Sequence, residues 1–127
     1  MTEPPHDRTR AQIEEQFRAR MAEQDARDPL RKVRDLLQTY VEDAVDLDEV
    51  RADMASVATH STRYLRQELE ALEWVLTTEQ PKYTLLDLVE GDANKGLDHD
   101  PTDSGAAVFL WEVARILREV LDEAGHR

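Results

Sequence analysis

The side chains of this sequence that are best suited to metal binding or catalysis fall in one acidic stretch. Six oxygen or nitrogen donors fall within twelve positions: Asp92, Asn94, Asp98, His99, Asp100 and Asp103. Hard cations such as calcium prefer clusters of this kind, but an EF-hand loop needs glycine at its sixth position and glutamate at its twelfth. Counted from Asp92, the glycine is fifth and the twelfth residue is Asp103. The spacing therefore fails the calcium motif. We expect no metal site here, and expect Asp100 and Asp103 to cap the helix that follows.

Outside this acidic stretch, the sequence offers few candidate catalytic residues. The histidines are His6, His60, His99 and His126, and the sequence has no H-E-x-x-H, P-loop, G-x-G-x-x-G or G-x-S-x-G motif. It has no cysteine, which excludes disulfides, Cys-ligated zinc, iron–sulfur clusters and thiol nucleophiles. His99 is flanked by Asp98 and Asp100 and is a candidate general base, but no nucleophile can be paired with it. A hydrolytic or metal-dependent enzyme built on this loop is thus an alternative; we expect neither catalytic residues nor a cofactor.

Charge is the strongest compositional signal. The chain of 127 residues has a net charge of -12, from 28 acidic and 16 basic side chains. Residues 1–40 hold eight of each sign, so the whole excess falls in residues 41–127. Such a field repels nucleic acid and anionic membranes and attracts basic partners. The simpler interpretation is that the charge serves solubility.

Two acidic stretches, residues 41–53 and 79–103, and two tryptophans make up the predicted partner-binding surface. The tryptophans fall among polar neighbours on their helices, which is typical of interface anchors; the alternative is that they pack under another helix or a loop. The predicted partner-binding residues are Asp43, Asp46, Asp48, Trp74, Asp92, Asp98, Asp100, Asp103 and Trp111.

The periodicity of apolar residues predicts helices that could position these side chains. Residues 1–8 contain two prolines and nothing to bury, and we expect a flexible tail. Residues 9–27 begin with a capping box and form a helix with a narrow stripe of Ile13, Phe17 and Met21, which suits a peripheral or docking helix. Asp28-Pro29 then starts an amphipathic helix over about 29–45.

The second half contains a long helix, a short one and a loop. Asp46 to Glu49 caps a continuous leucine stripe that predicts one helix over about 47–77, although Thr59-His60-Ser61-Thr62 could break it. A short helix over about 85–90 and a loop follow. The last helix starts at Asp100-Pro101 or Asp103-Ser104 and ends at Ala124, and its wide apolar arc places it at the centre of the fold.

These elements predict an all-α fold, a helical bundle of about four main helices plus one short helix, with residues 9–127 as a single domain. No apolar run approaches the ~20 residues of a membrane span, and the first twelve residues are polar. We therefore expect a soluble cytoplasmic protein that does not bind membranes or nucleic acid.

The segment from Thr84 to Leu121, TLLDLVEGDANKGLDHDPTDSGAAVFLWEVARILREVL, resembles a pattern found in small uncharacterised bacterial proteins. Its features are a leucine-rich turn, an Asp-x-Asn loop, Leu-Asp-x-Asp-Pro-x-Asp and a Gly-Ala-led apolar helix. Some such proteins resemble immunity proteins, partners encoded beside toxins. The resemblance implies a binding role and supplies no catalytic residue.

Together, charge and resemblance favour a non-enzymatic acidic binding protein that neutralises a basic protein partner in the manner of an immunity protein or inhibitor. The alternative is a structural subunit of a homo- or hetero-oligomeric assembly, built through the N-terminal helix.

Overall fold

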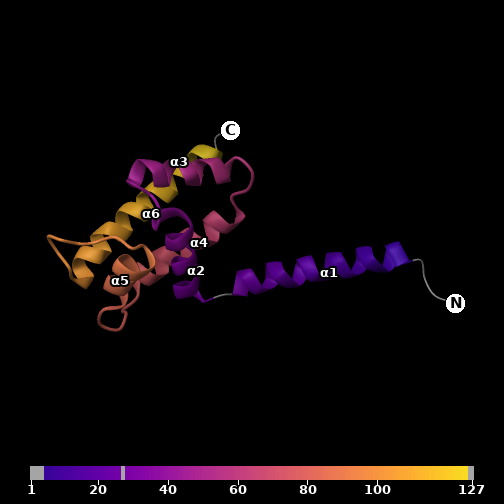
Figure 1. Cartoon of the computed structure of the whole chain (residues 1–127), viewed down its shortest axis with the longest axis horizontal. Helices are drawn as coiled ribbons and strands as arrows, with labels where there is room; N and C mark the ends of the chain where they lie inside the picture. The colour runs from indigo at the N-terminus through magenta and orange to yellow at the C-terminus, as the bar shows by residue number, and fades with distance from the viewer. Residues whose placement is uncertain (1–4, 27, 126–127) are drawn as a thin grey trace.

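The chain is all-α throughout the residues that the structure describes, 5–26 and 28–125, with side chains described for 10–22 and 28–125. The structure is a computed structural model (Figure 1). Its helices are α1 (Pro5–Ala26), α2 (Pro29–Leu36), α3 (Leu47–Ala58), α4 (Arg63–Thr77), α5 (Thr84–Asp87) and α6 (Asp103–Gly125). Two π-helical turns, η1 (Leu37–Val41) and η2 (Leu88–Asp92), continue α2 and α5. Among the described residues, no helix has both the length and the apolarity to cross a membrane.

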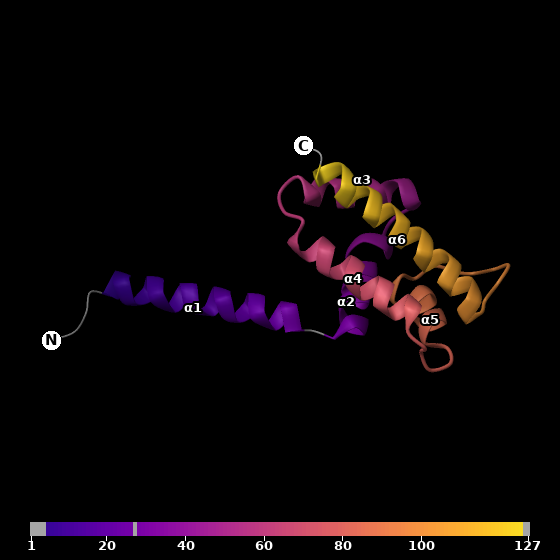
Figure 2. The ribbon, with the colours of Figure 1, turned by 180° about the vertical axis from the view of Figure 1, so that it is seen from behind.

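Helix α1 starts earlier than the sequence pattern suggests and stands apart from the rest of the chain. It begins at Pro5, four positions before the capping box at Thr9 where the sequence pattern starts it, so the expected helix start is wrong; residues 1–4 of the expected tail lie outside the described part. Proline is accepted in the first turn of a helix because that turn needs no amide donor. Figures 1 and 2 show α1 projecting from a body formed by α2 to α6.

The helix expected over 29–45 is shorter and carries a π-helical end. Asp28 caps it as predicted: its carboxylate accepts a 2.9 Å hydrogen bond from the Arg31 amide, with Pro29 in the first turn. The helical path ends at Val41 rather than residue 45. Extra residues in a π turn shift the side chains that follow, and such turns are frequent at functional sites.

The single helix expected over 47–77 is two helices. Asp46 caps α3 as predicted, through a 2.9 Å bond from the Glu49 amide. However, α3 ends at Ala58, and α4 starts at Arg63 after the Thr59–Thr62 segment. The hydroxyls of this segment bond to local groups: Thr59 donates to the Ser56 carbonyl at 2.7 Å, and Ser61 accepts from the Arg63 amide at 3.3 Å. This competition for backbone partners breaks the helix even though the leucine stripe is continuous.

Helix α6 is central, as its wide apolar arc predicts. It packs against α3, α4 and α5, while α4 also packs against α2. Figure 2 shows α4 and α6 side by side. The largest fully buried side chains come from all parts of the body and include Leu36, Met54, Leu65, Leu72, Leu88, Leu110 and Leu117. Burying each side chain of this kind contributes about 1.5–3 kcal/mol, so this core holds the elements that carry the candidate sites.

The start of α6 differs in detail from the expectation. Thr102 is the capping residue, because its hydroxyl accepts a 3.1 Å bond from the Gly105 amide; neither Asp100 nor Asp103 caps this helix. Asp100 supports the cap by accepting a 2.7 Å bond from the Thr102 hydroxyl. Any side chain at position 105 would collide with the Asp100 carbonyl oxygen, so the close approach of the loop to the helix requires glycine.

Candidate functional site

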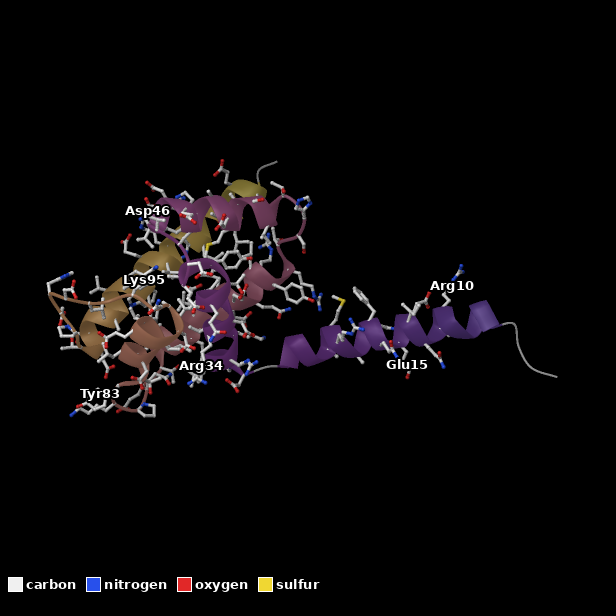
Figure 3. The ribbon with its side chains drawn as sticks, viewed as in Figure 1. Arg10, Glu15, Arg34, Asp46, Tyr83 and Lys95 are labelled. Carbon is white, nitrogen blue, oxygen red and sulfur yellow. The ribbon has the colours of Figure 1, made fainter. Side chains whose placement is uncertain are left out.

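The structure brings the two acidic stretches of the sequence together through Lys95. Its Nζ atom donates to the carbonyl oxygens of Ala44 at 2.7 Å and Glu42 at 3.2 Å, across more than fifty positions of the chain. The loop after η2 is thereby fixed to the turn between η1 and α3. Asp46 and Lys95, labelled in Figure 3, mark the two sides of this junction.

Four exposed carboxylates belong to the two segments that Lys95 joins, and we call them the acidic rim: Glu42, Asp43, Asp48 and Asp98. Within the described part of the chain, none of the four has a side-chain hydrogen bond or ion pair. Asp48 lies in the first turn of α3, where a carboxylate is favoured by the helix dipole. The rim is therefore a set of solvated negative charges, which can act on a partner through its electric field and by accepting hydrogen bonds.

The other predicted acids hold the fold together. Asp46 caps α3, and Asp92 accepts a 2.9 Å bond from Gln38 and lies 3.7 Å from the Arg34 guanidinium. Asp100 bonds to Thr102. These side chains serve the structure through their hydrogen bonds. Of the seven acids predicted to bind a partner, Asp43, Asp48 and Asp98 are exposed and have no such bond.

Asp103 has a role that the sequence did not suggest. Its two carboxylate oxygens accept bonds from the Tyr83 amide at 2.8 Å and the Leu86 amide at 3.0 Å. It therefore caps α5 from the first turn of α6. Tyr83 adopts a left-handed backbone with a φ of 74°, which is uncommon for a residue with a side chain. The Asp103 carboxylate stabilises this turn and ties α5 to α6.

The two tryptophans are exposed, in agreement with their polar neighbours in the sequence. Trp74 is 47% exposed and Trp111 is 41% exposed. They lie on α4 and α6, which are paired through Arg118 and Glu73 at 3.2 Å. The acidic rim is built instead from the ends of η1, α3 and η2, so the structure gives the tryptophans and the rim different supporting elements.

A pocket of about 380 Å³ between α2, η1 and α4 was missed by sequence reasoning. It is lined by Lys32, Asp35, Gln38, Thr39, Tyr40, Tyr64, Gln67 and Glu68. Burial, followed by the charge of Asp35, raises the pKa of Glu68 to about 7; burial and the charges of Glu68 and Asp53 raise the pKa of Tyr40 to about 12. Glu68 can therefore exchange a proton near neutral pH. The one sequence signal for this group is that Glu68 falls on the edge of the leucine stripe of α4 rather than opposite it.

The polar side chains of the loop after η2, which were the candidates for metal binding or general-base catalysis, do not come together in one site. His99 and Asp98 are exposed, Asp92 bonds to Gln38 of η1, and Asp100 bonds to Thr102. Over the described ranges, no group of three or more histidine or acidic side chains is arranged to hold a metal ion. His60 lies exposed in the turn between α3 and α4, and His126 lies outside the described residues.

Comparison with known proteins adds no functional assignment. Scans against protein families, curated proteins and solved structures give no significant match to this chain.

Proposed function

We propose that this chain is a non-enzymatic binding protein that uses its acidic rim to engage a basic protein partner. The observation that carries the proposal is the Lys95 junction, since it joins two acidic segments that are distant in sequence. Residues 42–49 and 90–98 together contain eight carboxylates and, as their single cation, Lys95. The Lys95 ammonium donates to backbone carbonyls and offsets one of these charges, so the two segments keep a net charge of -7, from eight acidic side chains and one basic one.

This arrangement suits recognition of a cationic surface. Complementary charge accelerates association and disfavours wrong partners, and it acts over a range set by the salt concentration. Folded segments also present their charges at lower entropic cost than a flexible acidic tail. A protein that neutralises a basic, nucleic-acid-cleaving toxin is one concrete form of the proposal, because such a toxin needs a cationic surface to bind its substrate.

The tryptophans supply candidate anchors for a second contact. Exposed Trp74 and Trp111 are of the type that dominates binding energy at protein interfaces. These anchors lie on α4 and α6, so their contact is distinct from the contact made by the rim carboxylates.

A fourfold substitution tests the proposal: Glu42→Gln, Asp43→Asn, Asp48→Asn and Asp98→Asn. Wild-type protein is used to capture partners from cells that produce the chain natively, and the captured protein is identified and purified. We expect a basic partner whose affinity falls at least tenfold in the rim variant and falls steeply with added salt.

The matched control neutralises four other exposed acids: Asp53, Glu79, Asp122 and Glu123. Both variants have the same net charge, so a loss confined to the rim variant assigns the effect to position rather than to total charge. Equal binding by both variants, or a partner whose affinity is insensitive to salt, would refute the proposed surface.

A structural role in an assembly is the second candidate, and the exposed apolar stripe of α1 favours it. Ile13 and Phe17 are the largest apolar side chains described on a helix that lies outside the body.

A further inference from the structure

Helix α1 presents an apolar stripe that contributes nothing to the core of the body. Ile13 is 59% exposed and Phe17 is 61% exposed, and the half-buried Met21 continues the stripe one turn further on. Figure 3 shows Arg10 and Glu15 on the part of α1 that projects away from the body. A shallow groove on this face is lined by Ile13, Glu14, Phe17 and Arg18.

A helix of this composition gains little stability by itself. Helices in water depend mainly on packing of an apolar face, and α1 has 22 residues with no such packing against the body. Its Ile, Phe and Met follow one another at intervals of four residues, so a single straight partner helix could cover all three.

The order of charges along α1 identifies what that partner is. Four pairs of like charge alternate in sign: Arg8 with Arg10, Glu14 with Glu15, Arg18 with Arg20, and Glu23 with Asp25. Phe17 lies at the middle of this series. If the helix is reversed about Phe17, each basic pair falls opposite an acidic pair, so the sequence is complementary to its own reverse.

We propose that α1 pairs in antiparallel orientation with α1 of a second copy of this chain, with the two Phe17 side chains at the centre. Ile13 then lies level with Met21 of the second copy. At about 100° per residue, Arg10 falls within the stripe, between Phe17 and Met21, whereas Glu14, Arg18 and Asp25 lie along one side of it. The pairing brings Arg10 near Asp25 of the other copy, and Glu14 near Arg18 of the other copy.

The charge of the body favours the same orientation. Residues 28–125 hold 22 acidic and 10 basic side chains, a net charge of -12. A parallel pair would place two such bodies beside each other, whereas an antiparallel pair separates them by about the length of α1. That length is about 33 Å at 1.5 Å per residue. Self-repulsion between the bodies is thereby reduced.

Sedimentation equilibrium of the full chain over micromolar to millimolar concentrations tests the pairing. We expect the mass to rise from 14.6 kDa toward twice that value. Phe17→Glu is expected to remain at the single-chain mass, because it places two carboxylates at the centre of the pair. Ala19→Glu adds the same charge on the opposite face of α1 and is expected to pair like the wild type.

Disulfide trapping tests the orientation, since the chain has no cysteine of its own. Arg10→Cys and Gln24→Cys lie level with each other in the antiparallel pair, so a mixture of the two variants is expected to form the mixed disulfide preferentially. A wild-type mass that stays at one chain, a Phe17→Glu variant that dimerises normally, or preferential linkage of each variant to itself would each overturn the proposal. If Phe17 instead binds a different protein, the wild-type mass stays at one chain, which overturns the proposal.

Discussion

At the scale of single residues, Glu68 illustrates what packing does to an ionisable group. It lies partly buried in the pocket between α2 and α4, near Asp35, and burial is the larger cause of its raised pKa of about 7. The pocket also contains Lys32, Tyr40 and Tyr64. The folded state therefore holds this proton at pH values where an unfolded chain, with an ordinary pKa of 4.5, has released it.

The protonation of Glu68 makes stability depend on pH in a defined direction. Between pH 4.5 and about 7 the folded state binds more protons than the unfolded state, so the free energy of unfolding falls as the pH rises through this range. The total fall from this group is at most about 3 kcal/mol. Glu68→Gln removes that loss. Between pH 5 and pH 8, the free energy of unfolding measured in urea is expected to decrease less in this variant than in the wild type.

Glu70→Gln is the matched control, because Glu70 is exposed on the same helix. It is expected to keep the wild-type pH dependence. The same change of stability with pH in wild type and Glu68→Gln would show that Glu68 titrates alike in the folded and unfolded chain.

At the scale of elements, short helices in this protein depend on side chains from elsewhere. Helix α5 has four residues and follows a left-handed Tyr83, so it has no capping residue of its own. The cap comes from Asp103, twenty positions after Tyr83. Similarly, the turn after η1 is held by Lys95. Asp103 and Lys95, which the sequence suggests are surface charges, thus join elements through hydrogen bonds.

Asp103→Ala is expected to destabilise the protein by about 1–3 kcal/mol, because two amide donors lose a charged acceptor. Asp98→Ala, in the same loop, removes an exposed carboxylate with no bonded partner and is expected to change stability by less than about 0.5 kcal/mol. Chemical denaturation of both variants measures the difference. Equal effects of the two substitutions would contradict the assignment of Asp103 as the cap of α5.

At the scale of the whole molecule, the chain divides into a packed body and a projecting helix. The core residues all come from Val33 to Leu121, and α1 contributes none of them. Its stripe and its charges are consequently available for contacts between molecules, whereas the charge excess lies in the body. Binding through the rim and pairing through α1 would use separate parts of the chain.

Deletion of residues 1–27 is therefore expected to leave the body folded. The midpoint of thermal unfolding should change by less than about 4 °C at low protein concentration, which corresponds to less than about 1 kcal/mol. Circular dichroism measures both this midpoint and the loss of the α1 helical signal. A truncated chain that fails to unfold cooperatively would show that α1 is part of the folding unit.

The sequence by itself determined the all-α fold class, the caps at Asp28 and Asp46 and the central position of the last helix. These features depend on local preferences and on the helical period, which neighbouring residues in the chain specify. The break at Thr59–Thr62 is local too, but there hydroxyl groups competed with an uninterrupted apolar stripe.

Tertiary structure alone decided which carboxylates are available. Asp92, Asp98 and Asp103 look alike in the sequence, yet Asp92 meets Gln38, Asp103 meets two amides of another helix, and Asp98 meets solvent. The raised pKa of Glu68 and the junction at Lys95 likewise depend on residues far away along the chain. Hydrogen bonding and desolvation act through space, and the path of the backbone determines which groups they join.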